Sequence, residues 1–548
     1  MAIMKAPPSG VKVRMYRHGH GDCYLLAFAG REGTQSRNVY VMIDCGLKPG
    51  SEIHRKTDPD NYATIHDIVD DIHASTGGEI DVVAITHEHQ DHVNAFSMKK
   101  NGKNIFDKIK FRQCWLGWTE DETDELANSL RERFRDTLVA LSFAQKKMAS
   151  LNSASSVSER LSDLLSFEIG DEGKTIRKTK EGLGIVKAFE SEMKKSPLAL
   201  RSELAARSIK GISNKKAMKY IRDKAQDPIK FLGPNSPPQS IPFVEDVKAY
   251  VLGPPRDQAL LLDLDPIGNE EFHLRPSDGT MALHDDTRGF ALAVTPELDS
   301  DSASQPFSPR YRISGEQVSN HHMQISGPID RTKREKGLDY IKSKYEDPAL
   351  DWRRIDDDWL GTSEGLALRL NNEVNNTSLV LAFELGKTGK VLLFTGDAQR
   401  GSWIGWSDLQ WTTEDCETTT TTTVKDLLSR CVFYKVGHHG SHNATLNGSE
   451  TDEYANIGWM ARGKFANDFV AMIPANTEWA LSKSKPWRHP LPEIEEALHK
   501  KAYGRVFRAD LDHVEKPAPS VLSNAKWTEF KKKTKETKLY FEYTIEDR

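Results

Sequence analysis

A histidine-rich stretch at residues 86–92 carries the strongest chemical signal in the sequence. It reads Thr-His-Glu-His-Gln-Asp-His and directly follows an apolar run at residues 81–86. Imidazole and carboxylate groups are ligands for zinc, iron or manganese, and four of them on a strand-to-helix turn can converge on one point. A solvated loop is the alternative, but a buried cluster of this kind would be costly without a metal because each group needs a partner. We therefore expect a metal site built around His87, His89, Asp91 and His92.

Four further motifs place residues of the same types at the ends of other apolar runs. An aspartate beside a glycine turn is common in any protein, so Asp44 and Asp397 are weak signals by themselves. They gain weight beside the histidine stretch, because one carboxylate at a strand end can hold two cations. The motifs are residues 43–46 (Ile-Asp-Cys-Gly), 394–397 (Phe-Thr-Gly-Asp), 435–441 (Lys-Val-Gly-His-His-Gly-Ser) and 487–490 (Trp-Arg-His-Pro).

Together these motifs resemble a known family. The pattern His-x-His-x-Asp-His after an apolar strand resembles the signature of hydrolases of the metallo-β-lactamase fold. Further matches make the chain similar to the branch that includes the nuclease-like domain of bacterial DNA-uptake competence proteins and phosphorylcholine esterases. They are Gly-His-Gly-Asp at 19–22, Asn-Asn-Thr-Ser at 375–378, Thr-Gly-Asp at 395–397 and His-His-Gly-Ser at 438–441. Arg488 stands where that branch has a glycine before the final His-Pro. The resemblance covers about half of the chain and implies an α/β protein of four layers, αββα.

The same resemblance implies two divalent metal ions, zinc or manganese, held by residues of these motifs. One carboxylate bridges the two ions, and another orients the histidine turn from behind the ligands. The implied ligands are His87 and His89 for the first ion, Asp91 and His92 for the second, and Asp397 as the bridge, with Asp44 as the orienting group.

One departure from the wider family leaves the first ion short of a ligand. Many members have a further histidine before the bridging aspartate, where this chain has Asn375 and Asn376. Asparagine is a poor zinc ligand, so we expect His438 to supply the third donor of the first site. His489 then completes the second site. Phosphate contact, or hydrogen bonding to the metal loop, is the alternative role for His438 and His439.

The resemblance also implies a mechanism and a substrate class. A hydroxide shared by two cations would attack a phosphorus or carbonyl centre, with Asp91 and Asp397 holding the ions and His439 stabilising the transition state or protonating the leaving group. The competence branch favours phosphodiester bonds, which predicts a nuclease or phosphodiesterase acting on nucleic acid or a nucleotide. His18 and His20 are candidate substrate contacts. Two alternatives remain: a hydrolase of a small ester, lactone or thioester, and an interaction or scaffold protein with a vestigial metal site.

Length and composition predict several units and no membrane span. The chain has 548 residues and a formal net charge of -5, which gives no footprint of nucleic-acid binding over the whole surface. It has no apolar run of about eighteen residues and no apolar leader, and its five cysteines lack CxxC spacing, so we expect a cytoplasmic protein without disulfides. The expected segments are a first core part at 1–98, a helical insertion at 99–244, a core strand at 245–256, an irregular insertion at 257–364, and a second core part with a C-terminal extension at 365–548.

Several local expectations accompany this division. Apolar residues at helical spacing predict amphipathic helices in the first insertion, and an Asp- and Ser-rich run at 299–304 predicts a loop in the second. A hairpin turn is expected at 386–389, and an exposed loop at the threonine run 418–423. His321 and His322 are expected to be solvated. The Lys-rich residues 177–222 are expected to form a solvated face rather than a nucleic-acid surface, and a protein partner is a further candidate role for the insertions.

Overall fold

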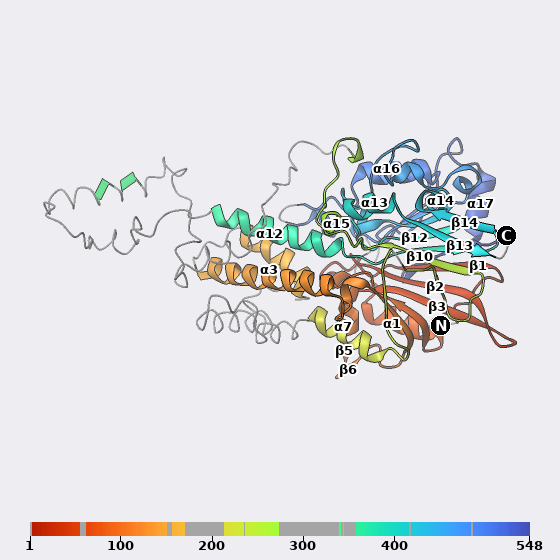
Figure 1. Ribbon diagram of the computed structural model, residues 1–548, viewed down its shortest axis with the longest axis horizontal. Helices are drawn as coiled ribbons and strands as arrows, with labels where there is room; N and C mark the ends of the chain where they lie inside the picture. The colour runs from red at the N-terminus through yellow and green to blue at the C-terminus, as the bar shows by residue number, and fades with distance from the viewer. Residues whose placement is uncertain are drawn as a thin grey trace.

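The computed structural model describes residues 3–54, 62–150, 156–169, 213–234, 236–272, 339–340, 343–344, 358–415, 418–483 and 486–548. Two β-sheets lie face to face, with helices on their outer faces (Figure 1). The long helices α3 (Glu125–Ser150) and α12 (Asp358–Asn375) pack together and project from one end. The mixed α/β class expected from the sequence is confirmed.

The first sheet has eight strands. Their spatial order is β18 (Thr534–Glu536), β19 (Tyr540–Glu546), β1 (Gly10–Tyr16), β2 (Cys23–Glu32), β3 (Gln35–Cys45), β4 (Glu79–Ala84), β7 (Lys110–Gly117) and β8 (Lys230–Leu232). Neighbours are antiparallel from β18 to β3 and parallel from β3 to β8. The carboxyl ends of β3, β4 and β7 therefore meet at one edge of the sheet.

The second sheet has seven strands. Their order is β17 (Val506–Arg508), β16 (Val470–Ile473), β15 (Cys431–Lys435), β12 (Val391–Phe394), β11 (Val380–Leu385), β10 (Val247–Gly253) and β9 (Gln239–Ser240). The antiparallel pair β11 and β12 confirms the hairpin expected around residues 386–389. From β12 to β17 the strands are parallel, so the carboxyl ends of β12, β15 and β16 also share an edge.

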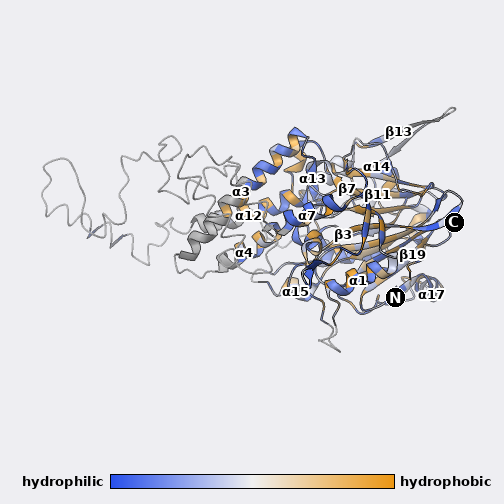
Figure 2. Ribbon diagram, turned by 90° about the horizontal axis from the view of Figure 1, so that it is seen from below, coloured by the Kyte–Doolittle hydropathy of each residue, from blue (hydrophilic) through white to orange (hydrophobic). Residues whose placement is uncertain are grey.

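The alternation of side chains along the strands explains the layers. In β3, Val39, Val41 and Ile43 belong to a core shared by both sheets, whereas Tyr40 and Met42 face a second core on the outside. Both faces of the strands are thus apolar and need cover, as Figure 2 shows by the apolar colouring of the strands. The helices that cover the first sheet are α1 (Ile65–Thr76) and α7 (Ser213–Lys224), and those that cover the second are α13 (Arg400–Trp406), α14 (Val424–Ser429) and α16 (Pro492–Lys501).

The first insertion is shorter than the expected 99–244. Strands β7 and β8 belong to the first sheet and β9 to the second, and β7 buries Phe111, Cys114 and Trp115. The strand was hidden because its sequence alternates charged and apolar residues next to a region rich in helix formers. Just before β7 in the sequence, β5 (Lys99–Lys100) and β6 (Lys103–Asn104) form a small antiparallel ribbon. Between β7 and β8 the structure describes α3, α4 (Ser156–Ile169) and α7.

Two other expectations meet the structure differently. The threonine run is not a loop: β14 (Thr418–Thr423) pairs with β13 (Gln410–Asp415), because β-branched threonines favour extended backbone. In the second insertion the structure describes α8 (Gln258–Leu261), a 3-10 turn at Gly268–Glu270 and the start of α12, while residues 299–304, His321 and His322 lie outside the described residues, as do most of 177–222. In the described part of the chain, no helix has the length and apolar character needed to cross a membrane.

Candidate metal centre

The chemistry-bearing residues lie where parallel strands of the two sheets end. The turn after β4 leads into α2 (Gln90–Val93) and carries the histidine stretch. Gly46 permits this turn to pass close to β3, because a Cβ there would lie 2.5 Å from the backbone carbon of Asp91. The other contributors are Asp44 at the end of β3, Asp397 after β12, and His438 and His439 after β15.

Four of these residues form a compact buried group. Asp91, His92, Asp397 and His439 offer ligand atoms that all lie within 4.8 Å of one another. His92 Nε2 is 3.1 Å from Asp397 Oδ2, and His439 Nε2 is 3.0 Å from Asp91 Oδ2. Each of the four is at most 1% exposed. The group could hold a metal ion.

His87 and His89 lie beside this group as a pair. His87 Nε2 is 3.0 Å from His89 Nδ1, and the rings of His87 and His92 are 4.1 Å apart between centroids. Two nitrogens that share one tetrahedral zinc ion lie roughly 3.4 Å apart, given zinc–nitrogen distances of about 2.0–2.1 Å. The pair is thus spaced closely enough for both rings to contact one cation.

Four histidines of the centre, His87, His89, His92 and His439, each have their second ring nitrogen in contact with a group outside the cluster. Such contacts fix which nitrogen carries the proton and leave the lone pair of the other nitrogen available to bind a metal ion, as they do for metal-binding histidines generally. The pairs are His92 Nδ1 with Asp44 Oδ2 at 2.8 Å, His439 Nδ1 with the Pro474 carbonyl at 2.8 Å, His87 Nδ1 with Ser378 Oγ at 3.2 Å, and His89 Nε2 with Glu168 Oε1 at 2.7 Å.

Backbone strain gathers at the same place. Asp44, His438 and His439 have φ values of 55°, 42° and 53°, in the left-handed region that favours glycine. Such a conformation costs about 1–3 kcal/mol and persists where the surrounding structure over-determines it, often at functional sites. Here it turns the Asp44 carboxylate under the histidine turn, where it accepts hydrogen bonds from the Thr86 amide and hydroxyl.

The centre holds more buried negative charge than its lysine balances. The carboxylates of Asp22, Asp44, Asp91 and Asp397 are all buried, and Lys435 contacts two of them, with Nζ 2.5 Å from Asp22 Oδ2 and 3.4 Å from Asp397 Oδ1. Asp91 Oδ1 is buried and finds no hydrogen-bond donor among the described residues. Buried carboxylates need cations or donors. The donor set, of imidazoles and carboxylates, fits a divalent metal ion.

The directions of the pKa shifts of His92 and Asp397 agree with this distribution of charges. Burial lowers the pKa of His92, but the carboxylates of Asp397, Asp22 and Asp44 outweigh it and raise the pKa well above its ordinary value. Burial would raise the pKa of Asp397, yet His92 and Lys435 hold it well below the usual range. Asp397 is therefore ionised at neutral pH and draws positive charge toward it.

A neighbouring trio, Asp22, Asp44 and His92, also meets the spacing of a metal cluster. It is not an independent site. It shares His92 with the first group, its Asp22 is neutralised by Lys435, and Asp44 is hydrogen-bonded to His92 Nδ1 and Thr86.

The structure places the two remaining ligand candidates at different depths. His438 Nε2 lies 4.0 Å from Asp397 Oδ2, with its Nδ1 held by Ser441 Oγ at 2.9 Å. His489 lies outside the compact group: its ring stacks on His20 at 5.5 Å and is 6.2 Å from the ring of His439. His439, expected to act on the transition state, thus occupies a position beside Asp91 that was expected for His489.

The two histidines near the start of the chain have different contacts: His18 contacts a backbone carbonyl, and His20 contacts two histidine rings. His18 is buried with its Nε2 2.6 Å from the Gly46 carbonyl oxygen, and burial lowers its pKa to about 4. His20 packs on His439 with ring centroids 4.0 Å apart, and its Nε2 is 3.4 Å from His489 Nδ1.

Sequence reasoning missed three residues of the centre. Lys435 stood in a quoted motif but was given no role, although a lysine inside an apolar strand end is a signal of a buried ion pair. Glu168 and Lys48 carry no local signal, because Glu168 contacts His89, and Lys48 contacts Ser166 of the same helix, only through the packing of α4, which is remote in sequence.

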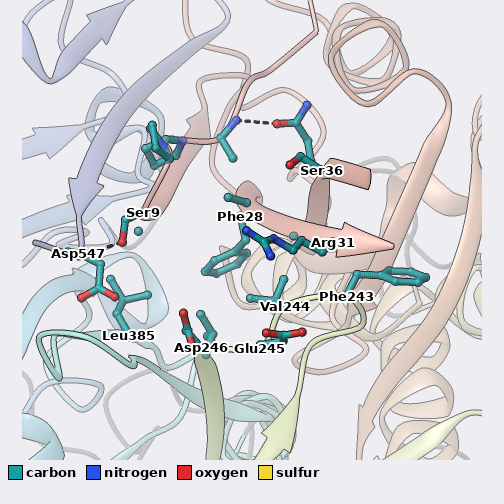
Figure 3. A pocket seen from close by; sticks show the side chains of 18 of the residues that line it. Ser9, Phe28, Arg31, Ser36, Phe243, Val244, Glu245, Asp246, Leu385 and Asp547 are labelled. Atoms are coloured by element: carbon teal, nitrogen blue, oxygen red, sulfur yellow. Dashed lines mark hydrogen bonds between the residues drawn. The ribbon is translucent and has the colours of Figure 1, made fainter. Parts of the chain in front are cut away.

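The described chain also has a cavity of about 740 Å³ far from these residues. It lies at the opposite end of β3, between the ends of β2 and β11 and the segment 243–247 (Figure 3). Phe28 and Leu385 form part of its wall, and the Ser9 hydroxyl donates to the Asp547 carbonyl there. None of the predicted site residues lines it.

Comparisons with known proteins add nothing to this picture: no protein-family model, no curated protein and no solved structure matches the chain with significance.

Proposed function

We propose that the chain is a metal-dependent hydrolase of the metallo-β-lactamase fold that acts on phosphodiester bonds. The observation that carries the proposal is the buried group of Asp91, His92, Asp397 and His439, with the histidine pair beside it. The arrangement of two facing sheets between helices supports the fold, since the strand ends meet where the resemblance expects the ligands.

The geometry favours one division of the ligands between two ions. We assign His87, His89 and His438 to one ion and Asp91, His92 and His439 to the other, with Asp397, which lies near both His438 and His92, shared between them. His439 replaces His489 in the second set, because its Nε2 faces Asp91 whereas the His489 ring packs on His20. When bound, two divalent cations lower the pKa of water and polarise the bond under attack.

Residues of the chain hold this arrangement and handle protons. Lys435 donates to the Gly396 carbonyl at 2.7 Å and pairs with Asp397, which fixes the carboxylate between the two sets of histidines. Burial and the neighbouring histidines lower the pKa of His489, so its ring is neutral at pH 7. His20 Nδ1 accepts from the Asn476 amide, so its Nε2 donates to His489 Nδ1 at 3.4 Å. This contact leaves the proton of the neutral His489 ring on Nε2, which can donate a hydrogen bond to a substrate oxygen.

The low solvent exposure of the centre limits the size of the substrate that can reach it. His87, His89, His92 and His439 are all at most 2% exposed, whereas His489 is half-buried. Access from the side of His489 alone suits a small phosphodiester or the end of a nucleic-acid strand better than the middle of a duplex. The same observation favours the second candidate, a hydrolase of a small ester, lactone or thioester.

A substrate panel on the full chain tests the proposal. The purified protein is analysed for bound metal and then assayed with Mn²⁺ or Zn²⁺ on single-stranded DNA, RNA, a nucleotide phosphodiester and a carboxylic ester. Metal-dependent cleavage of a phosphodiester supports the proposal, and cleavage of the ester alone supports the second candidate. Bound metal without any turnover would favour a scaffold with a vestigial site, and a protein that never retains a divalent ion would overturn the metal centre itself.

A further inference from the structure

Helix α4 of the first insertion places Phe167 and Glu168 against His89 of the metal centre, and Ser166 against the neighbouring Lys48. The Ser166 hydroxyl is 2.7 Å from the Nζ of buried Lys48, and the Phe167 ring lies 3.4 Å from that Nζ and 5.8 Å from the ring of His89. Glu168 follows, and its side chain is only 7% exposed. A helix that the sequence indicates as a peripheral addition therefore forms one wall of the centre.

Glu168 makes the contact that matters most for His89. Its Oε1 lies 2.7 Å from His89 Nε2, while His89 Nδ1 lies 3.0 Å from His87 Nε2. A carboxylate accepts a hydrogen bond, so this contact keeps the proton of the imidazole on Nε2. The Nδ1 lone pair is then free on the side that faces His87.

The end of α4 is anchored independently of this contact. Asn214 of α7 donates its side-chain amide to the Phe167 carbonyl at 2.6 Å and to the Glu168 carbonyl at 3.2 Å. The helix also packs against α12, α3 and α2, the last of which carries Asp91 and His92. Glu168 is therefore held in place by the fold rather than by His89 alone.

We propose that Glu168 is a positioning residue of the metal centre, which fixes the tautomer and orientation of His89 so that Nδ1 binds the cation. The inference rests on the proposed function, since it assigns a role toward the same ions. It makes the insertion part of the site. The second ring nitrogens of His92, His439 and His87 contact groups at or next to strands of the two sheets, whereas that of His89 contacts a carboxylate from a helix inserted between β7 and β8.

Metal affinity of the full chain tests the role. Zn²⁺ binding is measured by competition with a chromophoric chelator, and the absorption spectrum of the Co²⁺-loaded protein reports the ligand geometry. Loss of such an outer hydrogen bond typically weakens binding by about 10–100-fold. We expect E168A to weaken one site within this range and to alter the Co²⁺ spectrum, and E168Q to recover much of the affinity because its amide oxygen still accepts from Nε2.

Matched variants separate the role from a structural one. D163N removes a carboxylate from the same helix that pairs with Lys483 at 3.8 Å, and we expect wild-type affinity and spectrum. If E168A does not fold, E168D keeps the charge but draws it back by one methylene, and we expect a loss similar to that of alanine. Wild-type affinity and spectrum in the folded E168A or E168D variant would overturn the role of Glu168 while leaving the proposed function intact. A wild-type protein that binds no Zn²⁺ or Co²⁺ would overturn both.

Discussion

The two ends of strand β3 carry opposite kinds of polar site. At its start, beside Ser36 and Asn38, lies a cavity of about 740 Å³ with exposed cations such as Arg31 and Lys387 on its rim. At its end, Asp44 lies in a centre of imidazoles and carboxylates, in which Asp91, His92, Asp397 and His439 are buried. The residues that line the cavity include no cluster of metal-binding side chains, whereas the ligand atoms of the centre converge within 4.8 Å of one another.

The difference teaches which property indicates chemistry in this molecule. At the cavity end the Asp547 carboxylate is satisfied by hydrogen-bond donors of the chain: it accepts from the amides of Lys387 and Thr388 and from the Thr388 hydroxyl. At the centre the donors point at one another, and a buried carboxylate oxygen of Asp91 has no donor among the described residues. A buried carboxylate oxygen without a hydrogen-bond donor among the described residues therefore distinguishes the centre from the cavity end.

The largest expected effect is at the carboxylate between the two sets of histidines. D397A should reduce metal-dependent turnover more than about a thousandfold, since metal ions contribute several kcal/mol of transition-state stabilisation and each 1.36 kcal/mol is tenfold. Turnover and bound metal are measured on the same preparation. D547N, at the cavity end, is the control and should keep both. Full activity in D397A would remove the functional distinction between the two ends.

A second comparison uses two buried aspartates on neighbouring strands. Asp44 ends β3 at the centre, and Asp81 lies in β4 toward the other end, where its carboxylate accepts from the Tyr40 amide. D44N should weaken Zn²⁺ binding about 10–100-fold, because His92 loses its orienting carboxylate. D81N should leave Zn²⁺ affinity unchanged and lower only the free energy of unfolding. Equal metal affinities in the two variants would contradict the assigned role of Asp44.

Metal removal should have a moderate effect on stability. Ligand binding to the folded state alone adds about 2.7 kcal/mol to the free energy of unfolding when the free ion is at a hundred times its Kd. Chelation should therefore lower the unfolding midpoint in denaturant, and Zn²⁺ should restore it in a saturable manner. The same titration on D547N should match wild type, and on D397A the response should be lost. An unfolding midpoint that changes with neither chelator nor added metal would contradict the metal centre.

The smallest predicted effect is a pH dependence at Lys48. Burial lowers the pKa of Lys48 from the ordinary 10.5 to about 7, so above pH 7 the folded chain has released a proton that the unfolded chain still binds. Stability from this group therefore rises with pH, by about 2 kcal/mol between pH 7 and pH 9 at about 1.4 kcal/mol per pH unit. K48M lacks this contribution, so its stability relative to wild type should fall over the same window.

Denaturant unfolding of chelated protein at pH 7 and pH 9 measures the difference. K387M removes an exposed lysine at the cavity end and controls for the loss of a positive charge. A K48M difference that is the same at both pH values would refute the assignment.

Local sequence pattern predicted some elements well and others poorly. The apolar run at 81–86 and the turn at 386–389 predicted β4 and the β11–β12 hairpin, because alternation and turn residues act over a few positions. Strand β7 borders a region rich in helix formers and pairs with β4, which is remote in sequence. The threonine run of β14 pairs with the adjacent β13, but a run of one residue type carries neither alternation nor turn residues.

The candidate site follows the same division. The histidine stretch 86–92 is local and was predicted from spacing, whereas the contact of His439 with Asp91 joins residues 348 positions apart. That separation explains why His489 was expected where His439 lies. The same limit applies to Glu168, since no pattern within α4 indicates that one of its carboxylates reaches the centre. The family and the activity remain predictions.

Lys435 has a consequence for how the protein is assembled. Its ammonium group is buried against Asp22 and Asp397 and is raised in pKa despite its burial, because those carboxylates stabilise the charge. It is an internal counterion to two of the four buried aspartates, so part of the negative charge of the centre is balanced before any metal ion binds. We therefore expect a protein that folds empty and is loaded afterwards, in which the supply of metal regulates activity without governing whether the polypeptide survives.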